Sequence, residues 1–201
     1  MLFTHAGKSP QIDPTAWVAP DATVCGDVVI GPDARVMHGA RVIGEAGGSI
    51  RIGARTIVME NAVIRGSARH ACAIGDHCII GPNAHVTGAT LDDQVFIATG
   101  AAVFHGARLG KGSEVRVHAT VHLRTVLASG TTVPIGWVAV GEPAVLLPPD
   151  KHEQIWTVQE PLNFPGFVYG VERGTPDAMV EITSRLAEAL GAHATDQRSE
   201  A

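Results

Sequence analysis

The sequence predicts an all-β fold, a parallel β-helix, on three observations. Aliphatic residues recur at almost every sixth position, a small residue usually follows each of them four positions later, and large rings are scarce, with 23 glycines against three Trp, one Tyr and five Phe. A period of six with two inward positions fits neither a 3.6-residue helix nor an alternating hairpin. It fits short flat strands that wind into a prism, in which the aliphatic residue fills the interior and the small residue lets the chain turn.

The aliphatic series has eighteen members, all Val, Ile or Leu. Three hexads make one triangular coil, so the series predicts about six coils within a repeat domain at residues 1–145. Residues 146–201 should form a strap and helices outside the repeat. The members of the series are Val18, Val24, Ile30, Val36, Val42, Ile52, Val58, Ile64, Ile74, Ile80, Val86, Leu91, Ile97, Val103, Leu109, Val115, Val121 and Leu127.

Two of the hexads, residues 42–51 and 64–73, are longer than the others. Both fall on the same flank of the prism in successive coils, so their extra residues should bulge at neighbouring places. Stacked loops of this kind often form the rim of a site, although they can also simply cover an edge.

Beyond the repeat, the pattern changes from β to helical. Asp150 with Glu153 three residues later indicates the start of a short helix that extends to Val158. Residues 159–174 are rich in Pro and Gly and should form an extended strap. Thr175-Pro176 should start a second helix that ends at Gly191, and the polar remainder from about residue 192 should be frayed. The apolar face of the second helix would comprise Met179, Ile182, Leu186 and Leu190.

Composition excludes several classes of partner. The net charge of −5 leaves no basic surplus for nucleic acid, and no apolar run is long enough to cross a membrane. The first residues lack the layout of a signal peptide. The three cysteines (Cys25, Cys72 and Cys78) have no metal-ligand spacing, and their odd number favours a reducing cytoplasm. We expect Cys78 to be an inward packing residue.

Three pentapeptides of the repeat resemble the hexapeptide-repeat proteins: Ile30-Gly31-Pro32-Asp33-Ala34, Ile74-Gly75-Asp76-His77-Cys78 and Ile80-Gly81-Pro82-Asn83-Ala84. The resemblance implies a left-handed parallel β-helix followed by short C-terminal α-helices. Acyltransferases, nucleotidyltransferase partners and γ-class carbonic anhydrases all use this scaffold, so the repeat indicates a fold and not an activity.

Three longer stretches, residues 48–53, 60–64 and 74–89, are similar to the γ-class carbonic anhydrase-like group in order and approximate spacing. The resemblance implies a homotrimer in which three histidines from two subunits hold one metal ion. Such a metal lowers the pKa of its bound water to about 7, which creates the hydroxide that attacks carbon dioxide.

This chain departs from the family at all three histidine positions, which carry Arg65, Pro82 and Thr87. Arg is a permanent cation and Pro offers no side-chain ligand, so neither can bind zinc. We therefore expect no zinc at the family position, no other cofactor, and no working carbonic anhydrase. Arg65 and Thr87, next to Glu60, would instead suit a small anionic molecule such as a carboxylate.

His38 and Glu60 are the candidate catalytic pair. Both stand two residues after their aliphatic residue on the same flank of adjacent coils, so we expect them within hydrogen-bonding reach. The pair could be a general base with its orienting carboxylate, or a structural pair at a subunit interface.

The other histidines allow further interpretations. His118 and His122 lie on adjoining flanks of the last coil and could form a relocated metal site, with His105 contributing only through a neighbouring subunit. They could equally be surface histidines. His70 lies in the second long hexad, where an acyltransferase could place a base.

Three functions stay open. The first is a homotrimeric γ-carbonic-anhydrase-like protein without the zinc site, which binds or acts on a small anionic metabolite. The second is an acyl-CoA-dependent acyltransferase in which His38 or His70 is the base. The third is a non-catalytic assembly subunit, which exposed apolar C-terminal helices would favour.

Overall fold

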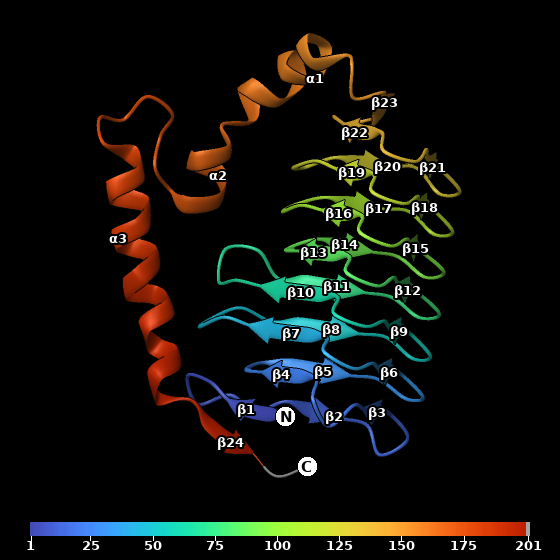
Figure 1. Ribbon diagram of the computed structural model, residues 1–201, viewed down its shortest axis with the longest axis vertical. Coiled ribbons are helices and arrows are strands. Elements are labelled where there is room, and N and C mark those ends of the chain that lie inside the picture. The colour runs from blue at the N-terminus through green and yellow to red at the C-terminus, as the bar shows by residue number, and fades with distance from the viewer. Residues whose placement is uncertain (200–201) are drawn as a thin grey trace.

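The computed structural model describes residues 1–199 and shows a parallel β-solenoid of stacked triangular coils, with helices along one side (Figure 1). Each coil places one strand on each of three faces. Face 1 holds β1 (Leu2–Thr4), β4 (Thr23–Cys25), β7 (Arg41–Gly44), β10 (Val63–Gly66), β13 (His85–Thr87), β16 (Ala102–Val103), β19 (Thr120–Val121) and β22 (Val138–Val140).

Faces 2 and 3 are all-parallel sheets of seven strands each. Face 2 holds β2 (Gln11–Ile12), β5 (Val28–Ile30), β8 (Ile50–Ile52), β11 (Cys72–Ile74), β14 (Thr90–Leu91), β17 (Arg108–Leu109) and β20 (Val126–Leu127). Face 3 holds β3 (Trp17–Val18), β6 (Arg35–Val36), β9 (Ile57–Val58), β12 (Ile79–Ile80), β15 (Phe96–Ile97), β18 (Glu114–Val115) and β21 (Thr132–Val133).

The predicted parallel β-helix is confirmed, but it is longer than six coils. Seven complete three-strand coils lie below β22, because β1 already pairs in parallel with β4 and β21 with β18. The eighteen-member series runs from Val18 of β3 to Leu127 of β20, so it leaves out β1, β2 and β21. The strand β1 falls outside the period because residues 5–10 interrupt it, with a bridge between His5 and Lys8.

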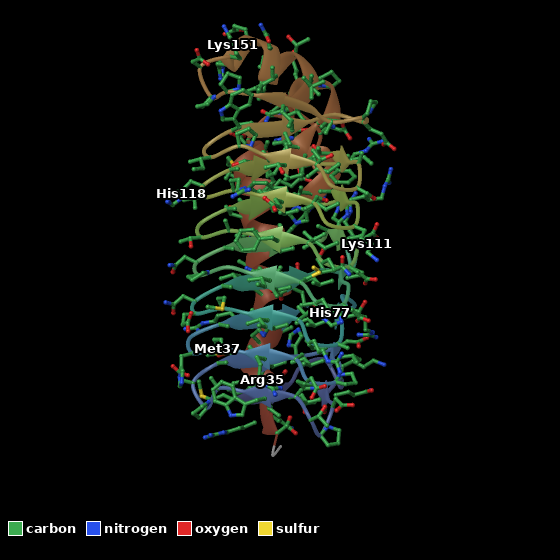
Figure 2. All side chains as sticks on the ribbon, turned by 90° about the vertical axis from the view of Figure 1, so that its right-hand side faces the viewer. Arg35, Met37, His77, Lys111, His118 and Lys151 are labelled. Atoms are coloured by element: carbon green, nitrogen blue, oxygen red, sulfur yellow. The ribbon has the colours of Figure 1, made fainter. Side chains whose placement is uncertain are left out.

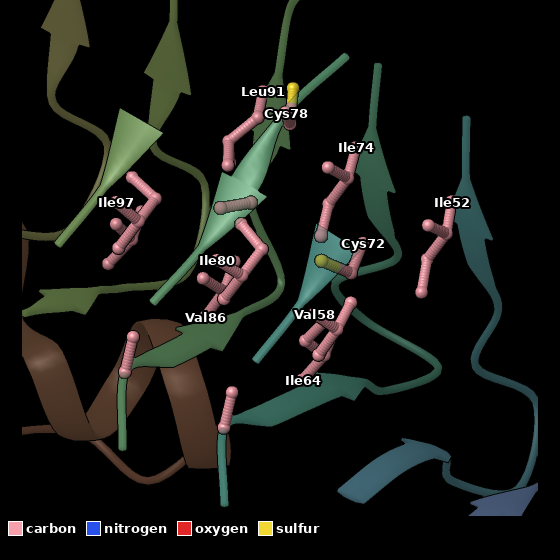
Figure 3. Close-up of a cluster of buried hydrophobic side chains, with 14 of the residues drawn as sticks. Ile52, Val58, Ile64, Cys72, Ile74, Cys78, Ile80, Val86, Leu91 and Ile97 are labelled. Carbon is pink, nitrogen blue, oxygen red and sulfur yellow. The ribbon is translucent and has the colours of Figure 1, made fainter. Parts of the chain in front are cut away.

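The aliphatic series fills the interior of the solenoid (Figure 3). Every member is buried except Val18, which is half-buried in the first coil. Identical inward positions stack from coil to coil, as Val42, Ile64 and Val86 do in register on face 1. This continuous aliphatic column makes aromatic residues unnecessary in the core.

The small-residue series breaks down in the two long hexads, where the fourth position is not inward. Ala46 and Ala68 are exposed because they lie in the loops 45–49 and 67–71. The inward place after each loop is taken by Ile50 and Cys72. The loops bulge side by side where face 1 turns into face 2, as the spacing predicts, and an added Cβ at Gly47 would lie 3.1 Å from the Cβ of Ala68.

The corner between face 3 and face 1 turns through a left-handed backbone position in successive coils. Asn61 and Asn83 adopt φ of 57° and 56° there, and Gly39 has φ of 69°. Asn tolerates this conformation better than most side chains, and the stacked positions let these successive coils turn sharply at the same corner. A Cβ at Gly39 would collide with the side-chain oxygen of Asn61, so a substitution there would force that side chain to move.

The chain leaves the solenoid through β23 (Val145–Leu147), which pairs antiparallel with β22. The C-terminal arm, residues 152–199, then runs down the side of the stack (Figure 1). It contains α1 (His152–Gln159), η1 (Glu160–Leu162), α2 (Phe164–Tyr169), α3 (Ala178–Gly191), η2 (Ala192–Thr195) and β24 (Gln197–Ser199).

Two expectations for the arm were wrong. The segment 159–174 is not an extended strap, because Asn163 in a left-handed conformation caps the short helix α2 through its side chain. The end of the chain is not frayed up to Ser199, because β24 pairs antiparallel with β1. The helix α3 ends at Gly191 as predicted, although only Ile182 of its apolar face is buried. No helix within residues 1–199 is long and apolar enough to span a membrane.

Candidate functional site

Arg65 and Thr87 lie side by side on the outward side of face 1, where Arg65 is half-exposed and Thr87 is buried. They are directly paired in the parallel register of β10 and β13, and they alternate with the inward residues Ile64 and Val86. The structure therefore brings together the two residues predicted to bind a ligand. We call Arg65, His70, His85, Thr87 and His105 the Arg65 patch.

Arg65 is held by a carboxylate from the neighbouring coil. Its Nη2 donates to Oε1 of Glu45, which stands at the start of the loop 45–49. The second oxygen of Glu45 lies 2.8 Å from Nε2 of His193, a residue of the C-terminal arm. One carboxylate thus links the patch to the far end of the chain, and Glu60 is not the carboxylate that Arg65 contacts.

Two histidines of the patch, His85 and His105, have lowered pKa values and are neutral at neutral pH. Burial, followed by repulsion from Arg65, lowers the pKa of His85. Burial, with added repulsion from His70, His85 and Arg65, lowers the pKa of His105 to about 4. Nε2 of His105 lies 3.3 Å from Oγ1 of Thr87, and its buried Nδ1 has no protein partner within residues 1–199.

His70 lies in the loop 67–71, against the C-terminal arm. Its ring packs on Phe167 of α2 with 4.5 Å between centroids, and Nε2 lies 3.1 Å from the carbonyl oxygen of Phe167. Its ring also contacts the edge of His105. With Nε2 held against a backbone carbonyl, His70 is better placed to support the patch than to act as a free base.

His38 and Glu60 are not brought together as a bonded pair. Nδ1 of His38 instead lies 2.6 Å from Oδ1 of Asp21, on the coil before it, and the edge of Trp17 contacts its ring. His38 has Asp21 on the coil before it and Glu60 on the coil after it, and its ring turns toward Asp21. The His38–Asp21 pair is exposed, on a corner away from the Arg65 patch.

His105, His118 and His122 do not form a metal cluster within residues 1–199. His118 is exposed at the corner between faces 3 and 1, as Figure 2 shows for the side of the solenoid opposite α3. His122 follows β19 on face 1, and His105 lies at the corner between faces 1 and 2. Burial lowers the pKa of His122 to about 4, so it too is neutral.

None of the three cysteines is an activated thiol. Burial raises the pKa of Cys25 and of Cys72 to about 12, and it raises the pKa of Cys78 as well. Cys78 packs inward as predicted. A reactive cysteine needs a lowered pKa, so nucleophilic thiol chemistry has no support here.

The residues at the three family ligand positions do not fit a zinc ion. Arg65 presents a cation that is already paired with Glu45, and Pro82 lies in the turn between β12 and β13 with no side-chain donor. Thr87 offers only a hydroxyl, which faces His105. Structural and catalytic zinc sites use thiolate, imidazole or carboxylate ligands, and this set contains none of them.

Comparisons with known proteins agree with the coil geometry. The chain is 29% identical over 159 residues, 77% of its length, to gamma carbonic anhydrase 2, mitochondrial, of Arabidopsis thaliana, and it spans about half (55%) of that relative. No family model matches the chain. The solved hexapeptide transferase family protein from Anaplasma phagocytophilum is 25% identical with a TM-score of 0.51, covering 92% of this chain and 95% of that one.

This chain is a hexapeptide-repeat left-handed β-helix protein. A putative acetyltransferase of Bacillus cereus shares the fold at 20% identity and a TM-score of 0.54, covering 84% of this chain and 95% of that one. The hexapeptide-repeat protein described here thus has a γ-carbonic-anhydrase-like sequence relative and transferase-like structural neighbours.

Sequence reasoning missed three residues of the site. His85 stands two positions before Thr87, so the alternation of β13 could have placed it on the same outer surface. Glu45 could have been found from its place at the start of the loop in the first long hexad, one coil before Arg65. His193 could not, because nothing local indicates that residue 193 returns to face 1.

Proposed function

We propose that this protein is a trimeric γ-carbonic-anhydrase-like β-helix without the family's zinc chemistry, and that the Arg65 patch binds a small anionic molecule. The observation that carries the proposal is the direct pairing of Arg65 with Thr87, where the family has zinc-binding histidines. A permanent cation and a hydroxyl replace metal ligands, so the patch favours a carboxylate over a divalent cation.

The chemistry of the patch supports an anion. Glu45 accepts from Nη2 of Arg65, and a guanidinium has five donors, so further N–H groups can face a ligand. His85 and His105 are neutral, and an imidazole N–H can add a hydrogen bond to a carboxylate without charge.

The assembly part of the proposal is a homotrimer packed along faces 1 and 3. Apolar side chains are half-exposed on these outer surfaces at Met37, Ile43 and Met59. On face 3, Trp17 is 42% exposed and Ile79 39% exposed in one outward column. We expect light scattering to give three times the 21.0 kDa mass of the chain, and a monomer at micromolar concentration would contradict the trimer.

Calorimetric titration with bicarbonate, acetate and oxalate tests the ligand. Arg65→Ala should weaken binding at least tenfold, because the charge-assisted contacts are lost. Arg51→Ala is the matched control: Arg51 is also an outward arginine paired with a carboxylate, Asp27, but it lies on face 2. Equal affinities in the two variants, or no binding of any of these anions to the wild type, would overturn the proposal.

Carbon dioxide hydration tests the loss of the family reaction. We expect no acceleration above the uncatalysed rate, with or without added zinc, because Arg65 at the ligand position would repel a divalent cation. Hydration that is abolished by a chelator would show that the family reaction persists. Zinc content alone does not decide the matter, because only the activity reports on this position.

The assembly-subunit alternative has one observation of its own. Met179 and Val180 of α3 are 66% and 65% exposed, and Leu186 and Leu190 are also exposed, so the apolar side of this helix is uncovered in the single chain. A photo-crosslinking residue at Val180 should then capture one defined partner, whereas one at the exposed Glu188 should not. Equal labelling at both positions would argue against an assembly role for α3.

A further inference from the structure

We propose that His5, Cys25, His193 and Asp196 form a structural zinc site that fastens the C-terminal arm to the first coils of the solenoid. These four residues are the one group within residues 1–199 whose potential ligand atoms gather closely enough for a metal ion. They come from both ends of the chain: His5 follows β1, Cys25 ends β4, and the other two lie between α3 and β24. Neither the spacing of the cysteines nor the family position indicates this site.

The four side chains converge on one point. Nδ1 of His5 lies 2.6 Å from Oδ1 of Asp196, and Nδ1 of His193 lies 2.8 Å from Oδ2 of the same carboxylate. The thiol of Cys25 lies 3.4 Å from that second oxygen. The two imidazole rings stack with 4.0 Å between centroids, so both present Nδ1 toward Asp196.

The dimensions fit a tetrahedral ion after a small expansion. All four candidate ligand atoms lie within 4.8 Å of one another. Ligands at the usual zinc distances of about 2.0–2.3 Å are separated from each other by about 3.3–3.8 Å around a tetrahedral centre. Moving the shortest contacts apart by roughly 1 Å would therefore admit the ion between groups that are already gathered.

The surroundings supply the outer contacts that zinc ligands need. The other nitrogen of His193, Nε2, lies 2.8 Å from Oε2 of Glu45, which gives the carboxylate–histidine arrangement that orients a metal-binding imidazole. His5 is only 1% exposed, and its Nε2 has no partner within the described chain. Burial of His5 would shield from water a metal ion that its Nδ1 binds.

The chemical types of the four ligand atoms favour zinc over other common metal ions. One sulfur, two imidazole nitrogens and one carboxylate oxygen match zinc, whereas calcium and magnesium prefer oxygen alone. Four protein ligands leave no open position for water, so the site would be structural and not catalytic. Its effect would be to hold residues 193–199 on β1, beside which β24 pairs.

Metal analysis and titration of the full-length protein test the proposal. The chain, expressed without a histidine tag and stripped with a chelator, should take up one zinc ion and gain thermal stability. Cobalt substituted for zinc should show a thiolate-to-metal charge-transfer band. Cys25→Ser should remove the band and weaken zinc binding at least tenfold. His193→Gln should also weaken zinc binding at least tenfold.

The controls separate this site from the family position and from misfolding. Cys72→Ser alters a cysteine that is equally buried but lies within the solenoid core, and Thr87→Ala alters the family position; both should keep the ion and the cobalt band. Hydrogen exchange should show slower exchange of the β24 amides with zinc than without it. No uptake of zinc by the wild type, or unchanged zinc uptake in both Cys25→Ser and His193→Gln, would overturn the proposal. Neither outcome would change the proposal that Arg65 binds an anion.

Discussion

The solenoid and the C-terminal arm are stabilised in different ways. The solenoid buries stacked aliphatic residues such as Ile64 and Ile80, and its strands pair with equivalent strands one coil away. The arm buries little: Ile182 is the one buried residue of α3, and the end of the arm is held by polar contacts of His193 and Asp196. Repetition therefore stabilises the solenoid evenly, whereas the arm depends on a few polar contacts.

The largest effect should come from the solenoid interior. Ile64→Ala removes a fully buried side chain from a column that cannot collapse, and should lower the free energy of unfolding by about 2–5 kcal/mol. Met179→Ala in the exposed arm is the matched comparison, with an expected change within about 0.5 kcal/mol. Urea unfolding followed by circular dichroism measures both, and similar losses in the two variants would contradict the contrast between the regions.

A smaller effect is expected where the arm is held. Asp196→Asn removes the charge that faces His5 and His193, and should cost about 1–3 kcal/mol of local stability. Hydrogen exchange should then accelerate in β24 and η2, while the amides of β10 and β13 stay protected. Faster exchange throughout the solenoid would mean that the arm and the coils unfold as one unit.

Two histidines, His105 and His122, should make the free energy of unfolding depend on pH. Burial lowers the pKa of His105 and of His122 to about 4, whereas an unfolded histidine titrates near pH 6.5. Between these values the unfolded chain binds more protons than the folded one at these two positions, so their contribution to stability should fall as the pH drops from about 6.5 toward 4.

The double variant His105→Gln, His122→Gln should flatten that slope in unfolding measured across the same pH range. His152→Gln, at an exposed position in the arm, should leave the slope unchanged. If the slope persists in the double variant, other groups cause the acid sensitivity.

The smallest effect is expected on the surface of the solenoid. Arg108 and Glu142 form an ion pair at 2.5 Å, but both side chains are more than half exposed. Such pairs contribute little, so Arg108→Ala should change the free energy of unfolding by less than about 1 kcal/mol, and the difference should shrink in high salt. A larger, salt-independent loss would show that Arg108 packs against the core.

The repeat was predictable because its information is local. Each hexad carries its own inward residue, so the positions from Val24 to Leu127 could be assigned one by one, and the long loops followed from the two longer hexads. The strand β1 was missed because residues 5–10 interrupt the period. The short helix α2 was missed because its cap, Asn163, acts through a single side chain in a Pro- and Gly-rich segment.

The site was predictable only where it follows the coil register. Arg65 and Thr87 are adjacent because strands of successive coils pair residue by residue. His38 was paired with the wrong carboxylate because a corner side chain can turn to either neighbouring coil, and it turns to Asp21. The cluster around Cys25 joins segments about 170 residues apart, and no periodicity in the sequence connects them.

Both ends of face 1 finish with a strand that runs against the others, β24 beside β1 and β23 beside β22. A stack of parallel coils otherwise exposes, at each end, backbone groups onto which the first coil of another molecule could add in register. Two antiparallel strands interrupt that template, because an incoming parallel coil would no longer match the terminal strand. On face 1 these two strands should therefore hinder end-to-end growth into fibres, and loss of β24 should leave one end of that face open to such polymerisation.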